Sequence, residues 1–280
     1  YMANIGTISS IADKESTIFS DELNHASIVE ACKLSGAKIK IFKHNCMEDL
    51  ETKIRKTNGK KLIVTEGIFS MDGDWAQLDQ ISELSEKHEM ITILDDAHGD
   101  FVLGRDGKGT SNFFNVEKKI DLYISSLSKG LGSFGGYVSG KKSLIDLCVN
   151  TSKTFIYTSA LPASINQYSL QRLESNREKY RKNLWKKINL FHTRLEEIEL
   201  STTSTSQIIP IVIGKEKTAI EFSKFLRKNG IFAQAIRYPT VKKGQARIRI
   251  SITEWLSEKE IEYTIPVSYT HLTLPTSDLV

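Results

Sequence analysis

The chain has 280 residues, of which 40% are hydrophobic and 26% charged, and its formal net charge is +4 at pH 7. This composition is typical of a globular protein with one large core or two smaller ones. The small, dispersed positive charge argues against nucleic-acid binding, and no run approaches the ~18 consecutive apolar residues of a membrane span. Cys32, Cys46 and Cys148 have neither metal-ligand spacing nor a disulfide pattern, so we expect reduced thiols and a cytoplasmic location.

Strand-like apolar runs alternate with helical patterns through the first half of the chain. Residues 27–35 and 77–88 have helical spacing. The predicted strands are residues 18–20, 38–42, 62–66, 90–94 and 122–125. This order predicts an α/β fold with a mostly parallel sheet that is covered on both faces. Another strand is expected at residues 134–139, where an antiparallel direction is also compatible with the pattern.

The second half begins with a long helical pattern from Pro162 to about Leu200, and Pro162 suits the first turn of a helix. A Ser- and Thr-rich run then predicts a joint between domains. A smaller α/β unit follows, with strands at 208–213, 231–236 and 247–252 and a helix at 218–228. In the last strand, arginines and isoleucines alternate, which predicts one polar face and one buried face.

These patterns divide the chain into three parts. Residues 1–200 form the predicted large domain, and residues 201–265 form a smaller C-terminal domain. Residues 266–280 abandon the charged amphipathic pattern that precedes them, so we expect a non-native tail and exclude it from the fold.

Three reactive side chains follow two of the predicted parallel strands. Asp95 ends the strand 90–94, His98 comes three residues later, and Lys129 follows the strand 122–125 among serines and glycines. Because the carboxyl ends of parallel strands meet at one edge of a sheet, these groups are expected to converge. Pyridoxal phosphate needs a lysine that forms a Schiff base and an acid that pairs with its pyridine nitrogen. The combination therefore predicts a site for this cofactor, although each residue alone is more often structural.

Other polar residues stand at similar turns. His25 lies at a strand-to-helix turn, where an imidazole could stack on a flat ring, although Asn24 or Ser27 would serve there as a simple helix cap. Glu66 and Ser70 follow another strand and are expected to face the same cleft. In the C-terminal unit, Arg249 with Arg237 on the neighbouring strand could clamp a substrate carboxylate, and a surface ion pair is the alternative.

Several stretches together resemble a known family of enzymes. They are LNHASIVEA, VTEGIFSMDGD, LDDAHGDFVLG, SSLSKGLGSFGGYVSG, FIYTSALPAS and AIRYPTVKKGQARIRIS, and they cover nearly all of the chain up to about Ile265. Their order and content are similar to those of the α-oxoamine synthases, which are pyridoxal-phosphate enzymes of fold type I. The resemblance is strongest to the branch of the family that acts in biotin synthesis.

The resemblance implies a role for each matching residue. Lys129 would be the Schiff-base lysine, Asp95 the partner of the pyridine nitrogen, and His25 the ring that stacks on the cofactor and takes part in catalysis. The remaining cofactor contacts would come from Tyr1, Met2, Glu66, Ser70, His98, Ser126 and Ser159, with Ser126 and Ser159 at the phosphate. Arg249 would bind the amino-acid carboxylate, with Arg237, Thr240 and His25 also near the substrates.

The resemblance also implies a reaction and a partner. The reaction would be a decarboxylative condensation of L-alanine with a pimeloyl thioester of coenzyme A or of an acyl carrier protein. Because the Ser159 position reaches across a subunit interface in this family, the protein is expected to be a homodimer. Two alternatives stay open: a sibling activity such as glycine C-acetyltransferase, and an inactive fragment that only binds the cofactor.

Some positions differ from the usual family pattern. Serines replace threonines at Ser126 and Ser159, which keeps the hydroxyl groups, while Asp100 and Tyr238 replace a small residue and a proline near the acyl channel. The family's N-terminal region, with a glycine-rich substrate loop, has no counterpart here. We therefore expect the chain to be a fragment.

Overall fold

The computed structural model describes residues 1–200 and 202–273, with side chains described as far as residue 267. These residues form two compact units. The first unit comprises Tyr1–Phe69 and Trp75–Arg177. The second comprises Ser70–Asp74 and the chain from Glu178 onward.

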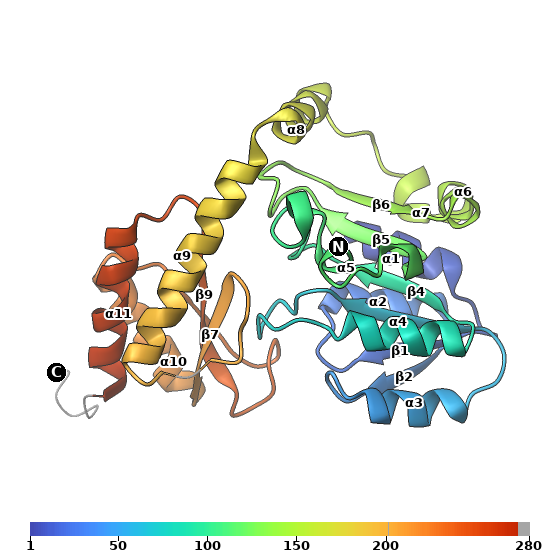
Figure 1. Cartoon of the computed structure of the whole chain (residues 1–280). Helices are drawn as coiled ribbons and strands as arrows, with labels where there is room; N and C mark the ends of the chain where they lie inside the picture. The colour runs from blue at the N-terminus through green and yellow to red at the C-terminus, as the bar shows by residue number, and fades with distance from the viewer. Residues whose placement is uncertain (201, 274–280) are drawn as a thin grey trace. The chain divides into compact units, whose positions relative to one another are not determined.

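A six-stranded sheet forms the centre of the first unit, in the order β2-β1-β3-β4-β5-β6 (Figure 1). The pairs from β2 through β5 are parallel, and β6 is antiparallel to β5. The strands are β1 (Thr17–Asp21), β2 (Lys38–Phe42), β3 (Lys61–Glu66), β4 (Ile91–Asp95), β5 (Leu122–Ser126) and β6 (Gly136–Gly140). The predicted α/β fold with a mostly parallel sheet is thus confirmed, and the sixth strand runs in the opposite direction.

Helices cover both faces of this sheet. The helices of the first unit are α1 (Met2–Ile11), α2 (Ala26–Ser35), α3 (Met47–Arg55), α4 (Leu78–Lys87), α5 (Thr110–Phe113), α6 (Lys142–Thr151), α7 (Lys153–Ile156) and α8 (Ala163–Glu174). One buried cluster joins α1, α2 and α6 to one face of the sheet, and a second joins α3 and α4 to the other face. Two short 3₁₀ helices, η1 (Arg105–Gly107) and η2 (Glu117–Lys119), lie between β4 and β5.

The strand sequences explain why both faces are covered. Neighbouring residues on a strand point to opposite faces, and here both are apolar. In β1, Ile18 belongs to the cluster under α1 and α2, whereas Phe19 belongs to the cluster under α3 and α4. The register places Glu66 of β3 beside Asp95 of β4, and Asp95 beside Ile124 of β5. Polar residues at these strand ends therefore share one edge of the sheet.

The second unit contains a three-stranded antiparallel sheet in the order β7-β9-β8. Its elements are α9 (Arg177–Glu197), β7 (Ile208–Gly214), α10 (Glu216–Lys228), β8 (Gln234–Ile236), β9 (Ala246–Ser251) and α11 (Glu258–Thr273). A single buried cluster packs Phe191 of α9, Phe222 of α10 and Ile261 of α11 against the sheet. The predicted buried face of the last strand is confirmed, since Ile248 and Ile250 are buried in this cluster, but Arg247 on the predicted polar face is buried as well.

The long helical stretch predicted from Pro162 to about Leu200 is interrupted once, because the chain forms the two helices α8 and α9. Ser175 follows α8 with an extended backbone, φ −72° and ψ 163°, and its hydroxyl donates to the carbonyl of Arg172. Neither Gly nor Pro marks this break, so the helical pattern runs across it. Helix α9 packs on the three-stranded sheet and therefore belongs to the second unit, which in this part of the chain begins at Glu178.

Helix α11 continues through Pro266 as far as Thr273, into the residues that were set aside as a tail. Residues 274–280 lie outside the described residues. In the part of the chain that the structure describes, no helix combines the length and the apolar character needed to cross a membrane.

Candidate active site

Asp95 is the last residue of β4 and is only 7% exposed. Its Oδ1 accepts a hydrogen bond from the backbone N–H of Ala97 (3.0 Å), and its Oδ2 accepts one from Asn4 Nδ2 (2.5 Å). Both partners are donors, which is the environment that favours an ionised carboxylate. The structure thus presents a buried, oriented anion at the carboxyl edge of the sheet.

His25 lies at the start of α2 and caps this helix through its ring, because Nδ1 accepts a hydrogen bond from the backbone N–H of Ser27. Burial lowers the pKa of His25; the negative charge of Asp95 opposes this shift, and the positive charge of Lys129 adds to it. Both charges therefore act on this imidazole. The structure brings together the three predicted catalytic residues, Lys129, His25 and Asp95.

Lys129 lies in the loop between β5 and β6 and is exposed. The loop is shaped by Gly130, where a Cβ atom would lie 2.5 Å from the backbone oxygen of Asp100. Ser126 and Ser128 precede the lysine, and their hydroxyl groups are 2.8 Å apart. The loop therefore presents one amine beside two hydroxyl groups. A glycine is required at residue 130 because the loop packs there against the segment after β4.

The N-terminus of α1 lies close to the end of β5 and the start of β6. A Cβ atom on Gly136 would lie 3.5 Å from the Cβ of Ala3, and Gly136 pairs with Ser126 across the β5–β6 ladder. Tyr1 is the N-cap of α1, and Tyr1 and Met2 are exposed. The first N–H groups of a helix have no partner within the helix, so this end can bind an anion such as a phosphate.

The other predicted residues of the first unit take different positions. Glu66 ends β3, is 3% exposed, and donates its backbone N–H to Asn24 Oδ1 (3.1 Å). His98 is half-buried in the turn that follows Asp95. Ser159 is exposed in the segment between α7 and α8.

In the second unit, the Arg249 side chain contacts the predicted cofactor residue Ser70. Arg249 Nε donates to the backbone oxygen of Ser70 (2.7 Å). Thr240 and Arg237 are both exposed, and the N–H of Thr240 donates to the Arg237 carbonyl (3.0 Å). Arg237 follows β8, whose last residue pairs with Arg247 on β9.

Arg247 has a different environment from the one its alternation with isoleucine suggested. Its side chain is 7% exposed and forms an ion pair with Asp72, and it also donates to the Met71 carbonyl (3.3 Å). A guanidinium that is buried against a carboxylate and a carbonyl has a structural role, because removing either charge would leave the other unpaired.

The sequence did not predict Asn4, nor the hydrogen bonds that two buried acids, Asp96 and Asp100, form on the segment after β4. Asp96 Oδ2 accepts hydrogen bonds from Tyr123 Oη (2.8 Å) and from the N–H of Thr110 (2.7 Å). Asp100 Oδ2 accepts from Ser125 Oγ (2.7 Å) and from Tyr137 Oη (2.6 Å). The polar residues on β5 and β6 were a usable signal, because β5 pairs with β4 and β6 pairs with β5.

Burial raises the pKa of Asp96 to about 7, although its hydrogen bonds with Thr110 and Tyr123 act in the opposite direction. An unfolded aspartate titrates near pH 4, so the folded protein takes up the proton more readily than the unfolded chain. We therefore expect Asp96 to favour folding below about pH 4, and this advantage to be lost as the pH rises to about 7.

Urea unfolding of the wild type and of an Asp96→Asn variant tests this expectation. Asparagine keeps an oxygen that can accept both hydrogen bonds but carries no charge. The free energy of unfolding of the wild type, minus that of the variant, should decrease as the pH is raised from 5 to 8. A difference that stays constant over this range would show that Asp96 titrates normally.

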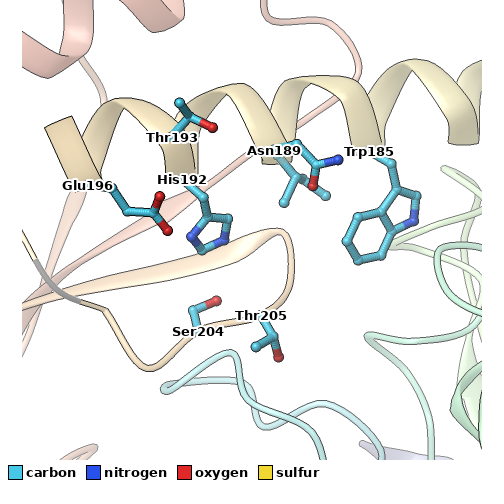
Figure 2. A pocket seen from close by; sticks show the side chains of 8 residues that line it. Trp185, Asn189, His192, Thr193, Glu196, Ser204 and Thr205 are labelled. Carbon is cyan, nitrogen blue, oxygen red and sulfur yellow. The ribbon is translucent and has the colours of Figure 1, made fainter.

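The second unit also contains a pocket of about 400 Å³ beside α9 (Figure 2). It is lined by Trp185, Ile188, Asn189, His192, Thr193, Glu196, Ser204 and Thr205. Burial lowers the pKa of His192, whose ring is directed toward Ser204. No residue predicted from the sequence lines this pocket, and the described residues contain no group of three or more His, Cys, Asp or Glu side chains that could hold a metal ion.

The residues of the first unit fit pyridoxal phosphate. The cofactor needs an acid for its ring nitrogen, a flat neighbour for its ring, an amine for its aldehyde and donors for its phosphate. Asp95, His25 and Lys129 supply the first three. The N–H groups in the first turn of α1 and the hydroxyl of Ser126 supply donors for a phosphate.

Comparisons with known proteins agree with this geometry. A family model described as aminotransferase class I and II matches residues 1–266. A putative 8-amino-7-oxononanoate synthase of Acetivibrio thermocellus is 45% identical over 95% of this chain and 69% of the relative. The 8-amino-7-oxononanoate synthase 1 of Bacillus subtilis is 39% identical over 95% of this chain and 69% of the relative.

Solved structures show the same fold. A serine palmitoyltransferase variant from S. paucimobilis with bound PLP has a TM-score of 0.93 at 26% identity, covering 97% of this chain and 70% of that chain. The 8-amino-7-oxononanoate synthase of Francisella tularensis has a TM-score of 0.85 at 29% identity, covering 97% and 79%. The predicted fold type and cofactor are therefore confirmed, and the chain belongs to the class I and II aminotransferase family.

Proposed function

We propose that this protein catalyses the pyridoxal-phosphate-dependent condensation of L-alanine with a pimeloyl thioester, which yields 8-amino-7-oxononanoate for biotin synthesis. Relatives that are 39–45% identical over 95% of the chain carry the name of this activity. The observation that carries the proposal is the convergence of Asp95, His25 and Lys129 at the carboxyl edge of the first sheet. In the reaction, a bond forms between the alanine Cα and the thioester carbonyl carbon, and the thiol and carbon dioxide leave.

The protein's own residues would divide the work among them. Pyridoxal phosphate, when bound, supplies an electron sink for negative charge at the substrate Cα. The Asp95 carboxylate, held by Ala97 and Asn4, would keep the cofactor's ring nitrogen protonated. The Lys129 amine would remove the Cα proton, because the loop leaves it exposed beside Asp95 and His25.

The anionic groups of the ligands would be bound elsewhere on the chain. The N-terminal end of α1, at Tyr1 and Met2, would bind the cofactor phosphate together with Ser126 and Ser159. Arg249 would bind the alanine carboxylate, since a guanidinium offers two parallel N–H donors to such a group. Glu66, Ser70 and His98 would complete the cofactor contacts, and Arg237 and Thr240 would lie near the substrates.

Serine palmitoyltransferase is a second candidate, because a structure of that enzyme has the higher TM-score of the two solved structures compared above. The sequence favours the first candidate, at 45% identity against 26%. Glycine C-acetyltransferase activity is the sibling alternative that the motifs leave open. Fold similarity does not determine the substrate, so the amino-acid preference must be measured.

Product analysis with competing substrates tests the proposed activity. The protein is incubated with pyridoxal phosphate, pimeloyl coenzyme A and equal concentrations of alanine, glycine and serine, and the products are separated by mass spectrometry. We expect the alanine product to exceed each of the others by about tenfold or more, the discrimination that one methyl group or hydroxyl can provide. A dominant glycine or serine product would reject the alanine assignment, and cofactor binding without any product would favour an inactive fragment.

We also propose that the protein forms a homodimer through the segment from α6 to α8, called here the α6–α8 surface. This surface exposes large apolar side chains in the first unit, which is typical of a protein interface. They are Leu147, Val149, Phe155, Ile156, Tyr157, Leu161, Tyr168, Leu170 and Leu173. Ser159 lies in the same segment, so a dimer would bring this hydroxyl to a partner subunit.

Sedimentation of charged variants tests the dimer. A Phe155→Asp, Tyr157→Asp double variant should sediment as a monomer, whereas the wild type should sediment at twice the chain mass, because two carboxylates would be unpaired in an apolar interface. Trp255→Asp is the matched control, since Trp255 is 93% exposed in the second unit. A double variant that stays dimeric would exclude this surface.

The proposal places the enzyme in the cytoplasm, as expected for a protein in which Cys32, Cys46 and Cys148 all carry free thiols. Cell fractionation tests this placement. Recovery of the protein from the membrane fraction or from the secreted fraction would contradict it.

A further inference from the structure

Asn4 connects the Asp95 carboxylate to helix α2, at the start of which His25 lies. Asn4 lies on α1, is 3% exposed, and uses the two N–H donors of its amide on two different partners. One bond goes to Asp95 Oδ2 (2.5 Å) and the other to Ser27 Oγ (2.8 Å). A carboxylate can only accept, so the amide nitrogen must face Asp95. The orientation of the Asn4 amide is therefore determined by its charged partner.

Ser27 passes this constraint on to His25. The Ser27 side chain is fully buried, and its oxygen accepts the hydrogen bond from Asn4. The hydroxyl hydrogen is then available for His25 Nδ1, which lies 2.7 Å from Ser27 Oγ. The backbone N–H of Ser27 points to the same ring nitrogen (3.2 Å). His25 Nδ1 thus faces two donors and has to be an acceptor.

We infer that Asn4 and Ser27 form a hydrogen-bond relay that holds His25 as the neutral tautomer with its proton on Nε2. In a neutral imidazole one nitrogen donates and the other accepts, so an accepting Nδ1 leaves the proton on Nε2. Asn4 and Ser27 are then positioning residues. His25 acts in this site as a hydrogen-bond donor through Nε2, and not as an imidazolium that gives up a proton.

The charges around the ring support a neutral His25. Burial lowers its pKa, the positive charge of Lys129 acts in the same direction, and the negative charge of Asp95 raises it. These two charged groups come from the end of β4 and from the loop after β5. A proton on Nδ1 would also have to displace both Ser27 donors. The catalytic use of the Nε2–H group rests on the proposed function, whereas the tautomer does not.

The test is a long-range ¹H–¹⁵N correlation spectrum of histidine-labelled protein loaded with pyridoxal phosphate, with the His25 signals assigned from a His25→Gln variant. The wild type should show an unprotonated Nδ1 and a protonated Nε2, without change between pH 6 and pH 8. A protonated Nδ1 or an imidazolium pattern at pH 7 would overturn the inference. This measurement needs no substrate, so its failure is distinct from failure of the proposed function.

Variants then test the relay itself. Asn4→Ala and Ser27→Ala should each abolish the single-tautomer pattern and give averaged ¹⁵N shifts at the two ring nitrogens. Ser10→Ala is the matched control, because the Ser10 hydroxyl bonds only within α1, to the Gly6 carbonyl (2.6 Å). Circular dichroism checks that each variant is folded. If both relay variants keep the wild-type pattern, the capping bond from the Ser27 N–H alone holds the tautomer, and the relay is rejected.

Discussion

Replacing Lys129 by alanine should lower the rate of product formation by at least about 10³-fold, within the range of losses that follow removal of a catalytic acid or base. The exposed amine of Lys129 lies in the loop after β5, and its charge acts on His25 together with that of Asp95. No other lysine of the first unit was predicted to face these groups. Single-turnover assays with saturating substrates measure the effect, because they separate the chemical step from product release.

Lys87→Ala is the matched control for this experiment. Lys87 is exposed on α4, where it pairs with Glu51 of α3, and such surface pairs contribute about 1 kcal/mol or less. The control should keep the wild-type rate and fold. A Lys129→Ala variant with more than a tenth of the wild-type rate would exclude Lys129 as the base and would remove the main chemical argument for the site.

Replacing Asp95 by asparagine should lower kcat by about 10²–10⁴-fold, while the chain remains folded. The amide is similar in size and can still accept the bond from Ala97, but it has no charge with which to keep a ring nitrogen protonated. The loss should appear mainly in kcat, since the phosphate and carboxylate contacts of the ligands are unchanged.

Asp79→Asn is the control for Asp95→Asn, because Asp79 is an exposed acid in the first turn of α4. The absorbance of the bound cofactor gives an independent readout, since loss of a ring proton changes its spectrum. If Asp95→Asn keeps both the wild-type kcat and the wild-type spectrum, then the buried carboxylate has a purely structural role.

The elements that could be predicted from the sequence are those with a clear period and marked ends. The strands β1 to β5 lie within about two residues of the predicted runs, because buried parallel strands are short apolar stretches between turns. Helix α2 ends at Gly36, which adopts φ +75°, the left-handed conformation that glycine favours at this position. Helix α1 was missed, since its buried residues include Asn4, Gly6 and Thr7 and its apolar periodicity is weak.

The residues of the candidate site that directly follow strands could be predicted from the sequence. The residues that reach the site through contacts between distant parts of the chain could not. Asp95 and Lys129 stand at strand ends, so local pattern and chain order bring them to one edge of the sheet. Asn4 is 91 residues from Asp95, and only the packing of α1 near the end of β5 makes their hydrogen bond possible. Arg247 was misjudged for the same reason, since its ion-pair partner Asp72 lies 175 residues away.

The most direct test of the account is borohydride reduction of the protein after incubation with pyridoxal phosphate, followed by peptide mapping. The account predicts a phosphopyridoxyl group on Lys129 and on no other lysine, in a chain that circular dichroism shows to be folded. Labelling that is scattered over surface lysines of the folded chain, or that is confined to a different lysine, would contradict it.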